Sequence, residues 1–444
     1  MKIARFINKL CVLECSVMFV IEVELHYGRQ LLKVDIPRRN LLLVADLNEV
    51  PGVHDENLEI TRAIRNPIGH PGIQTLAQKG RKTLILVDDF TRATPAYKIL
   101  PKIVEELNEA GVSDRGIQII LAGGTHRHMK REEILQKIGK QVMERFEILQ
   151  HDIETVKNLD ELVYLGRTPL GTPISVNKHV MEAENKIAVG GIVGHPLAGW
   201  GGGAKIIQPG VCGEETTWVT HWLLTKYRGE ELLGISDNPV RLEMEEVAKK
   251  VGLDFIVNVI QNRKGEIVGV VAGDPIKAHR EGVEIAKKIY AVKVPAKVDI
   301  VLTDAYPHDV DMWQAVKGIY AAEPVVKKGG TIILCASCPD GISNEHPALS
   351  EYGYIPADQV EKLIKLEKMD DLVGASDCAR VGELLKDVKI ILYSEISKDD
   401  TLKLNFEYAE TLQKAVDEAL ARHGSDAKVV VLRNAGDMVP IVPK

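Results

Sequence analysis

The sequence predicts an α/β protein made of two α/β domains with mostly parallel sheets. Short apolar runs rich in β-branched residues alternate with amphipathic segments along most of the chain. The apolar runs are continuous, a pattern typical of strands buried on both faces of a parallel sheet. The chain has 444 residues, which suits two or three domains better than one.

A strand pair opens the predicted fold, and strands and helices then alternate. Residues 18–25 and 30–36 predict two strands joined by a turn at Tyr27 and Gly28. The later apolar runs predict strands at 83–87, 116–121, 186–193, 299–303, 331–334, 388–393 and 428–432. The amphipathic segments between them predict helices at 96–110, 131–140, 239–251, 275–290 and 405–423.

A domain boundary is expected near residues 275–298, where a charged helix ends and a new strand begins. We therefore assign 1–280 to an N-terminal α/β cofactor-binding domain and 290–425 to a C-terminal α/β domain. The last strand is free to return to either domain, and we assign 426–444 to a terminal strand that returns to the N-terminal one. Residues 1–17 are interpreted as an extension upstream of an alternative start at Met18, with a signal peptide as the less favoured alternative.

Composition excludes several classes of function. The net charge of −7 disfavours a nucleic-acid partner, because phosphate binding requires concentrated positive charge. The sequence has no run of about 20 apolar residues, so we expect no membrane span. Its six cysteines fit no disulfide framework, which indicates a reducing compartment and a cytoplasmic protein. Cys335 and Cys338 form a redox pair, form half a metal site, or simply close a strand; we favour the last interpretation.

Residues 195–205 carry the most informative pattern, His-Pro-Leu-Ala-Gly-Trp-Gly-Gly-Gly-Ala-Lys. Glycines let a backbone approach a ligand closely, and a glycine-rich loop after a strand can offer N–H groups to an anion. Lys205 directly behind this loop can neutralise a phosphate or attack an electrophilic carbon. His221, one helix length later, can bind a metal. Together these residues predict a site for a phosphorylated, metal-bearing cofactor.

Polar clusters follow four of the predicted strands, at 88–92, 123–128, His195 and 304–309. Ligands of open α/β sheets bind beyond the carboxyl ends of the strands. Three clusters lie in the first predicted domain and one in the second, so we expect the active site in the cleft between the domains. Two members of the last cluster, His308 and Asp309, either line this pocket or cap a loop.

Four spaced motifs occur in order: Asp-Asp-x-Thr-Arg, Gly-Thr-His-Arg, His-x3-Gly-x-Gly-Gly-x2-Lys-x3-Pro-Gly, and Gln-Ala-Val-Lys-Gly. Together they resemble the nickel-dependent lactate racemase family, over about residues 20–341. The resemblance implies a racemase or epimerase of a small 2-hydroxy acid that works by reversible hydride transfer. It also implies a covalently bound nickel-pincer nucleotide, a pyridinium-3,5-bisthiocarboxylic acid mononucleotide carrying nickel, which separate biosynthetic enzymes supply.

The resemblance assigns roles to individual residues. Lys205 matches the covalent, catalytic lysine and His221 the nickel ligand, while His126 and His195 match the two acid/base histidines. The substrate-binding positions are Arg92, Gln314, Lys317 and Trp313. The cofactor-binding positions, besides Lys205, are Asp89, Thr91, Gly201, Gly202 and Gly203.

Two other functions stay open. One is a nicotinamide-type oxidoreductase, although the missing Gly-x-Gly-x-x-Gly after the first strands counts against it. The other is a non-catalytic nickel-nucleotide binding protein. The substrate is also left open between lactate and longer, aromatic, dicarboxylic or polyhydroxy 2-hydroxy acids, and so is a homo-oligomeric state.

Overall fold

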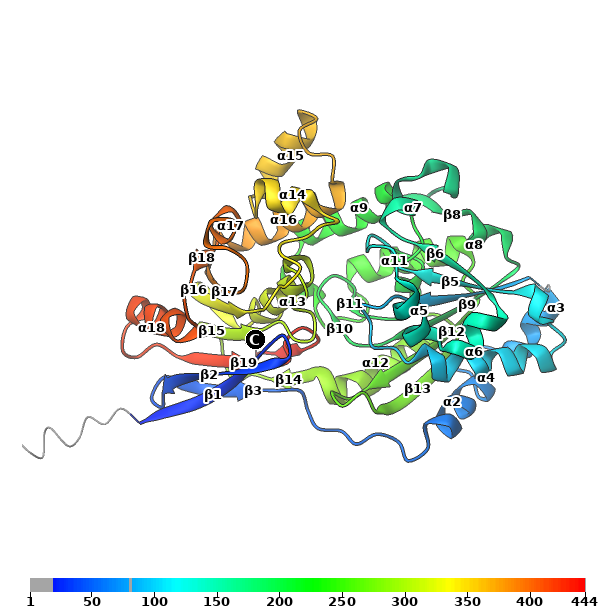
Figure 1. The fold of residues 1–444 in the computed structure, drawn as a ribbon, viewed down its shortest axis with the longest axis horizontal. Coiled ribbons are helices and arrows are strands. Elements are labelled where there is room, and N and C mark those ends of the chain that lie inside the picture. The colour runs from blue at the N-terminus through cyan, green and yellow to red at the C-terminus, as the bar shows by residue number, and fades with distance from the viewer. Residues whose placement is uncertain (1–18, 80–81, 444) are drawn as a thin grey trace, which may run out of the picture.

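The computed structural model describes residues 19–79 and 82–443, which form two six-stranded sheets flanked by helices (Figure 1). The first sheet has the order β13-β12-β9-β4-β5-β6, and only β13 runs antiparallel to its neighbour. Its strands are β4 (Thr83–Asp88), β5 (Ile117–Ala122), β6 (Glu147–His151), β9 (Asn185–Gly191), β12 (Phe255–Gln261) and β13 (Ile267–Gly273).

The second sheet is parallel throughout, with the order β18-β17-β16-β15-β19-β3. Its strands are β3 (Leu41–Ala45), β15 (Val298–Asp304), β16 (Val326–Cys335), β17 (Lys389–Tyr393), β18 (Glu407–Tyr408) and β19 (Val429–Leu432). The α/β class with mostly parallel sheets is thereby confirmed, and each of the seven later strand predictions coincides with a strand of one of the two sheets.

Shorter ladders and helices complete the fold. The ladders pair β1 (Val20–Tyr27) with β2 (Gln30–Pro37), β7 (Leu162–Arg167) with β8 (Pro173–Asn177), β10 (Gly194–His195) with β11 (Gly199–Trp200), and β14 (Ala291–Lys293) with β20 (Val439–Ile441). The helices before β14 are α2 (Glu56–Arg65), α3 (Leu76–Lys79), α4 (Ala96–Glu109), α5 (Arg131–Ile138), α6 (Lys140–Arg145), α7 (Ile153–Lys157), α8 (Lys178–Glu182), α9 (Glu214–Trp222), α10 (Gly229–Leu232), α11 (Pro239–Val251) and α12 (Lys277–Tyr290). Those after it are α13 (Met312–Ala322), α14 (Pro347–Tyr352), α15 (Ala357–Lys365), α16 (Leu372–Leu384), α17 (Lys398–Lys403) and α18 (Leu412–His423).

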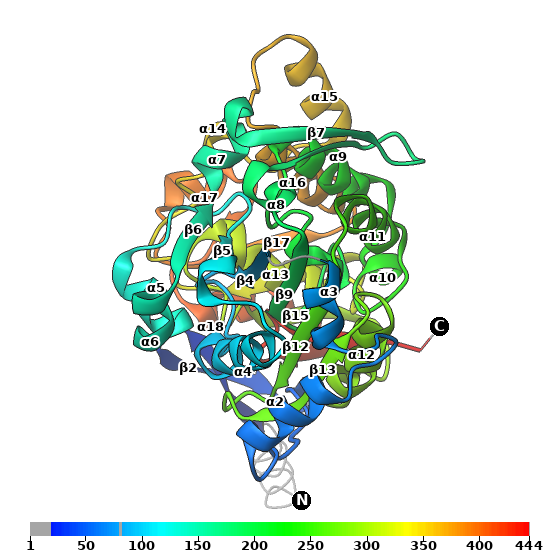
Figure 2. The same ribbon diagram turned by 90° about the vertical axis from the view of Figure 1, so that its right-hand side faces the viewer.

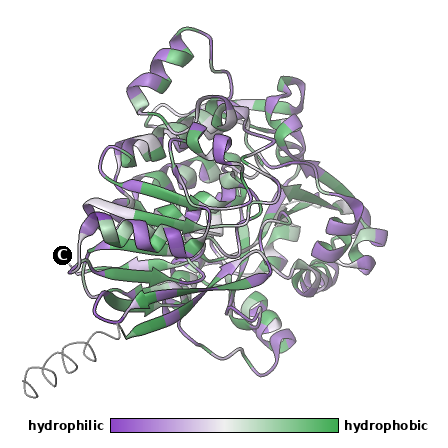
Figure 3. Ribbon diagram, turned by 60° about the vertical axis from the view of Figure 1, so that its left-hand side comes forward, coloured by the Kyte–Doolittle hydropathy of each residue, from purple (hydrophilic) through white to green (hydrophobic). Residues whose placement is uncertain are grey.

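Burial on both faces explains why the strands are continuously apolar. Successive side chains of a strand point to opposite faces, and in β4 Leu84 and Leu86 join one hydrophobic core while Ile85 and Val87 join another. Helices cover both faces of the first sheet, which Figure 2 shows edge on. The strands of both sheets are the most apolar parts of the ribbon, whereas the helices carry mixed surfaces (Figure 3).

The strand order reverses direction once in each sheet. In the first sheet β4 has β5 on one side and β9 on the other, and in the second β15 has β16 on one side and β19 on the other. Such reversals open a crevice beyond the carboxyl ends of the two strands concerned. The loops after β4, β9, β15 and β19 are therefore the expected place for a ligand.

The predicted domain boundaries need two corrections. The segment 20–45 does not belong with the first sheet, because β3 pairs with β19 and the β1–β2 hairpin packs its apolar side on the second sheet. The terminal strand does not return to the N-terminal domain either: β19 lies between β15 and β3, and β20 pairs with β14. All four residues of β19 are buried, as is typical of a central strand between two parallel neighbours.

The helix predicted at 405–423 begins later than expected. Asn405 has a left-handed backbone (φ 63°), and β18 follows it as the edge strand of the second sheet. The helix starts at Leu412, where the Thr411 side chain accepts a hydrogen bond from the backbone N–H of Lys414. The predicted extension at 1–17 lies outside the described residues, and among the residues described no helix is long and apolar enough to cross a membrane.

Candidate active site

A cavity lies at the crevice of the first sheet and is closed on its other side by α13 of the second. The sequence-predicted residues that line it are Asp89, Arg92, His126, His195, Gly201, Gly202, Gly203, Lys205, His221, Trp313, Gln314 and Lys317. Thr91 is the exception: it lies behind the cavity wall, where its hydroxyl donates to Asp89 and accepts from Arg92. The site residues thus converge from five separate stretches of sequence.

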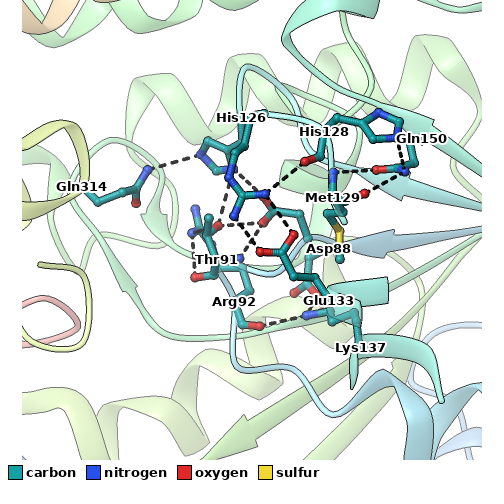
Figure 4. Close-up of polar contacts among 12 residues, drawn as sticks. Asp88, Thr91, Arg92, His126, His128, Met129, Glu133, Lys137, Gln150 and Gln314 are labelled. Atoms are coloured by element: carbon teal, nitrogen blue, oxygen red, sulfur yellow. Dashed lines mark hydrogen bonds and ion pairs between the residues drawn. The ribbon is translucent and has the colours of Figure 1, made fainter. Parts of the chain in front are cut away.

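His126 and Asp89 form a hydrogen-bonded pair at the ends of two adjacent strands. Asp89 directly follows β4, and His126 follows β5 after a tight turn in which Gly124 has a left-handed backbone (φ 59°). His126 Nδ1 lies 2.6 Å from Asp89 Oδ2, so Nδ1–H donates to the carboxylate. The other ring nitrogen, Nε2, lies 3.3 Å from the Gln314 amide nitrogen and accepts from it (Figure 4).

This pair gives His126 the protonation pattern of a general base. Burial opposes the ionisation of Asp89, but the neighbouring charges and hydrogen bonds of His126, together with Arg92, hold the pKa of the carboxyl well below its ordinary value. An ionised Asp89 fixes the tautomer of the ring and stabilises the imidazolium that forms when Nε2 takes a proton. The lone pair of Nε2 accepts the Gln314 hydrogen bond at the cavity wall, so a substrate hydroxyl must displace the Gln314 amide to reach it.

Arg92 is held in place from both its backbone and its side chain. Its Nη1 donates to the Thr91 hydroxyl (2.7 Å), and its carbonyl accepts from the buried Lys137 ammonium (2.9 Å; Figure 4). Lys137 is in turn paired with Asp88 at 2.5 Å. The guanidinium therefore presents its remaining N–H groups to the cavity from a fixed position, as two-point recognition of a carboxylate requires.

His195 has the opposite arrangement to His126. Its Nδ1 accepts from the backbone N–H groups of Leu197 (3.3 Å) and Ala198 (3.2 Å), which leaves the proton of the neutral ring on Nε2. Burial, followed by the positive charges of Lys205 and Arg92, lowers the pKa of His195 well below its ordinary value. In this conformation His195 offers an N–H to the cavity, and it can act as a base only after its ring turns.

The glycine loop is pinned by buried polar side chains behind it. Gly202 and Gly203 have left-handed backbones (φ 71° and 59°), and a Cβ on Gly202 would lie 2.7 Å from Asn258 Oδ1. Asn258 accepts from the Gly203 N–H at 2.8 Å, and His279 Nε2 lies 2.8 Å from the Gly201 carbonyl. The loop is therefore preorganised before any ligand binds.

A buried arginine lies under the same loop. The Arg241 guanidinium donates to the carbonyls of Ala198 and Gly202, each at 3.1 Å, and to that of Trp200. Burial lowers its pKa to about 10, which leaves it cationic at neutral pH. Its charge makes the loop a more favourable place for an anion.

Lys205 follows this loop in a 3-10 turn (Gly203–Ile206) and lines the cavity. Burial, and then the charges of Arg92 and Arg241, lower the pKa of its ammonium to about 7. A large fraction of the amine is therefore neutral at neutral pH. A neutral, desolvated lysine amine is the state that attacks an electrophilic carbon.

His221 has the protonation state of a metal ligand. On α9, its Nδ1 lies 2.8 Å from the carbonyl of Thr217 one turn earlier, so Nδ1–H donates and Nε2 keeps its lone pair. Burial lowers the pKa of His221 to about 4, against the opposing effect of the Thr217 hydrogen bond. A neutral imidazole with a fixed tautomer is the form that binds a transition metal.

The protein side chains alone do not make a complete metal site. Within 19–79 and 82–443, no group of three or more His, Cys, Asp or Glu side chains is placed to hold a metal ion. A metal bound at His221 would therefore need most of its donors from a bound group. That condition fits a cofactor that brings its own donor atoms to a single protein imidazole.

Helix α13 supplies the opposite wall of the cavity. It begins at Met312, and the carboxylate of the capping residue Asp311 accepts from the backbone N–H of Gln314 (2.8 Å). Gln314 and Lys317 lie three positions apart on one face, and the ammonium donates to Gln314 Oε1 at 2.8 Å. Trp313 packs on His346 with ring centroids 3.9 Å apart.

Sequence reasoning missed several residues of this site. Arg241, Asn258 and Asp437 belong to no motif. Burial against the glycine loop reveals Arg241 and Asn258, and a hydrogen bond to His308 reveals Asp437. Of the two residues left open after β15, His308 contacts Lys317 (3.1 Å), whereas Asp309 binds the hairpin turn through the Gly28 N–H (2.6 Å) and carries no site role.

Cys335 and Cys338 have the properties of buried structural residues at the end of β16. Cys335 and Cys338 are buried free thiols, and burial raises the pKa of both. Cys335 Sγ donates to the carbonyl of His26. A buried thiol with a raised pKa is a poor nucleophile and a poor metal ligand.

The comparisons with known proteins agree with this arrangement. A lactate racemase N-terminal domain model matches residues 27–232, and a lactate racemase C-terminal domain model matches residues 292–439. The chain is 29% identical over 424 residues to the lactate racemase of Thermoanaerobacterium thermosaccharolyticum, covering 92% of this chain and 97% of that protein. It is 28% identical over 423 residues to the lactate racemase of Lactiplantibacillus plantarum, covering 93% and 98%.

Solved structures extend the likeness to the fold. The lactate racemase apoprotein of Thermoanaerobacterium thermosaccharolyticum superposes with a TM-score of 0.82 at 28% identity, covering 95% of this chain and 100% of that chain. A Thermotoga maritima protein shares the fold at a TM-score of 0.64 and 22% identity, covering 89% and 100%. The two domain models together span most of the sequence, and the chain belongs to the lactate racemase family.

Proposed function

We propose that this protein racemises or epimerises a small 2-hydroxy acid on a nickel-pincer nucleotide that Lys205 holds covalently. The observation that carries the proposal is the convergence in one cavity of three differently prepared groups. These are a lysine amine with a pKa of about 7, a neutral imidazole at His221, and the Asp89–His126 pair. The names of the two relatives, lactate racemases, support the reaction class.

The residues present suit the nickel-pincer nucleotide. Lys205 would attach it, His221 Nε2 would bind its nickel, and the pinned loop 199–203 above Arg241 would hold its phosphate. When bound, the group supplies an acceptor for a hydride from the substrate α-carbon and returns that hydride to either face. This chemistry avoids a carbanion, which matters because the α-hydrogen of a 2-hydroxy acid is not acidic.

The protein's own groups supply substrate binding and proton transfer. Arg92 and Lys317 line the cavity, and together they would bind the substrate carboxylate. His126 Nε2 would take the hydroxyl proton from one enantiomer, with Asp89 stabilising the imidazolium. His195 would serve the other enantiomer. The keto acid formed between the two steps is planar at C2, so hydride can add to either face and give either enantiomer.

A chiral assay tests the proposal. Cofactor-loaded protein given pure L-lactate is expected to produce D-lactate until the two are equal, and the same experiment with larger 2-hydroxy acids would define the substrate range. Loaded protein that carries the nucleotide but converts none of these acids would contradict an isomerase and favour a nickel-nucleotide binding protein. Net formation of keto acid with reduction of added nicotinamide would favour the oxidoreductase alternative.

Replacing His221 with alanine is expected to lower nickel content more than nucleotide content. The substitution removes one metal ligand while Lys205 and the glycine loop remain. Metal analysis and intact mass on the same preparation give the two quantities. Equal nickel per nucleotide in the variant and the wild type would assign the metal ligand to another residue.

Covalent loading of apoprotein is expected to accelerate between pH 6 and pH 8. The lowered pKa of Lys205, about 7, makes the neutral amine fraction rise from about one tenth to about nine tenths across this range. The time course of the mass adduct at each pH measures the effect. Arg92→Gln removes a cation that lowers this pKa, so its loading curve should move to higher pH. A flat wild-type profile would contradict a titrating amine.

A further inference from the structure

A buried hydrogen-bonded chain runs from the C-terminal segment to the cavity. Asp437 Oδ1 lies 2.9 Å from His308 Nε2, and His308 Nδ1 lies 3.1 Å from Lys317 Nζ. The ionised Asp437 carboxylate can only accept, so the ring proton lies on Nε2 and donates to Asp437, and Nδ1 of the neutral ring accepts from Lys317 Nζ. His308 is therefore neutral with a fixed tautomer, and burial lowers its pKa to about 4.

Lys317 is oriented by this chain. Its ammonium has three N–H groups: one donates to His308, and a second donates to Gln314 Oε1 at 2.8 Å. Lys317 also lines the cavity, so the third N–H is the one available to a ligand there. The two hydrogen bonds hold the Lys317 ammonium in one orientation, with its third N–H directed into the cavity.

The charges around Lys317 are mixed. The Arg92 guanidinium and the protonated fraction of Lys205 disfavour its charge, and the carboxylates of Asp437 and Asp311 favour it. Burial, followed by Arg92, holds the pKa of Lys317 well below its ordinary value, while Asp437 opposes that effect. The protonated state of Lys317 therefore depends on the carboxylate at the far side of His308.

Two glycines allow the segment of Asp437 to pack closely: its chain neighbour Gly436, and Gly194 from the segment of His195. A Cβ on Gly436 would lie 2.6 Å from His308 Cδ2, and a Cβ on Gly194 would lie 2.4 Å from the Asp437 carbonyl oxygen. The segment that carries Asp437 is thus wedged between the loop of His308 and the loop of His195. Ala435 in the same segment donates its N–H to Asp304 at 3.0 Å.

We propose that His308 and Asp437 are positioning residues that aim Lys317 at the substrate carboxylate and keep it charged. The Asp437 carboxylate polarises the His308 ring and makes Nδ1 a stronger acceptor for Lys317, as a carboxylate does for a metal-binding histidine. The inference rests on the proposed function, because that function gives Lys317 a carboxylate to bind. Its first consequence, the state of the Lys317 amine, is nevertheless measurable without cofactor or substrate.

The test is the pH dependence of Lys317 acetylation in apoprotein. Trace acetic anhydride labels neutral amines, and peptide mass spectrometry reports each lysine separately. Asp437→Asn keeps the side-chain volume and removes the charge, so the Lys317 midpoint should move to lower pH by about 0.5–1 unit. His308→Leu should shift it in the same direction. Lys178, which is paired with Glu161 at 2.8 Å and does not line the cavity, is the internal control, and its acetylation midpoint should not move.

Kinetics of loaded enzyme give the second readout. Asp437→Asn should raise KM for the 2-hydroxy acid about tenfold, the scale of a weakened charged hydrogen bond, and the rise should grow with pH while kcat changes less. An unshifted Lys317 midpoint in Asp437→Asn overturns the inference even if the wild type racemises. If the Lys317 midpoint shifts but loaded protein converts no 2-hydroxy acid, the positioning role of Asp437 and His308 stands and the proposed function is overturned instead. A misfolded His308→Leu leaves the isosteric Asp437→Asn to decide.

Discussion

Replacing Lys205 with alanine is expected to abolish covalent attachment of the cofactor and, with it, all activity. The wild-type lysine combines a neutral amine near pH 7 with a position directly behind the pinned glycine loop. Protein made together with the biosynthetic enzymes should show a nucleotide adduct by intact mass in the wild type and none in the variant.

Lys205→Arg is the matched control for this experiment. Arginine keeps a positive charge at the position but stays protonated and supplies no nucleophile. It should therefore lack the adduct as alanine does, although it can retain some noncovalent nucleotide. An adduct of unchanged mass in either variant would remove Lys205 from this role.

Loss of either His126 or His195 is expected to slow racemisation by at least about 10²–10³-fold, the typical scale of general acid–base catalysis. A full racemisation uses both histidines, one for each enantiomer, whereas cofactor loading uses neither. Each alanine variant should still convert one enantiomer to enzyme-bound keto acid, and the enantiomers should be opposite for the two. Rapid quench of loaded protein with each pure enantiomer measures this.

The structure adds an asymmetry to that expectation. His126 has an unprotonated Nε2 that becomes free once the Gln314 amide is displaced, whereas His195 presents an N–H because its Nδ1 accepts two backbone hydrogen bonds. The half-reaction that starts at His126 should therefore be the faster one. If both variants racemise within a few-fold of wild type, the two-base mechanism is wrong for this protein.

The part of the site that could be predicted from sequence is the part that follows buried strands. Asp89, His126 and His195 each come after a continuous apolar run, and the carboxyl ends of parallel strands meet at one edge. The pattern of apolar residues therefore determines both the sheet and the neighbourhood of these side chains. The same argument could not find Asn258, which lies inside β12 and interrupts its apolar run.

The parts that could not be predicted depend on pairings between the chain ends. β3 pairs with β19, and β20 with β14, although nothing in the apolar pattern of any one strand specifies its partner. This pairing brings Asp437 to His308, behind Lys317, and places residues 20–45 with the second sheet. Arg241 is similar: its helix is amphipathic like many others, and only its burial under the glycine loop distinguishes it.

The proposed transfer of the substrate α-hydrogen as hydride has one direct test. L-Lactate carrying deuterium at C2 is given to loaded protein in ordinary water, and the D-lactate formed is analysed by mass spectrometry. We expect D-lactate to keep its deuterium, because a hydride returned to the opposite face does not exchange with solvent. D-lactate that has lost its deuterium at the rate of racemisation would show that the hydrogen leaves as a proton, and hydride transfer would then be wrong for this protein.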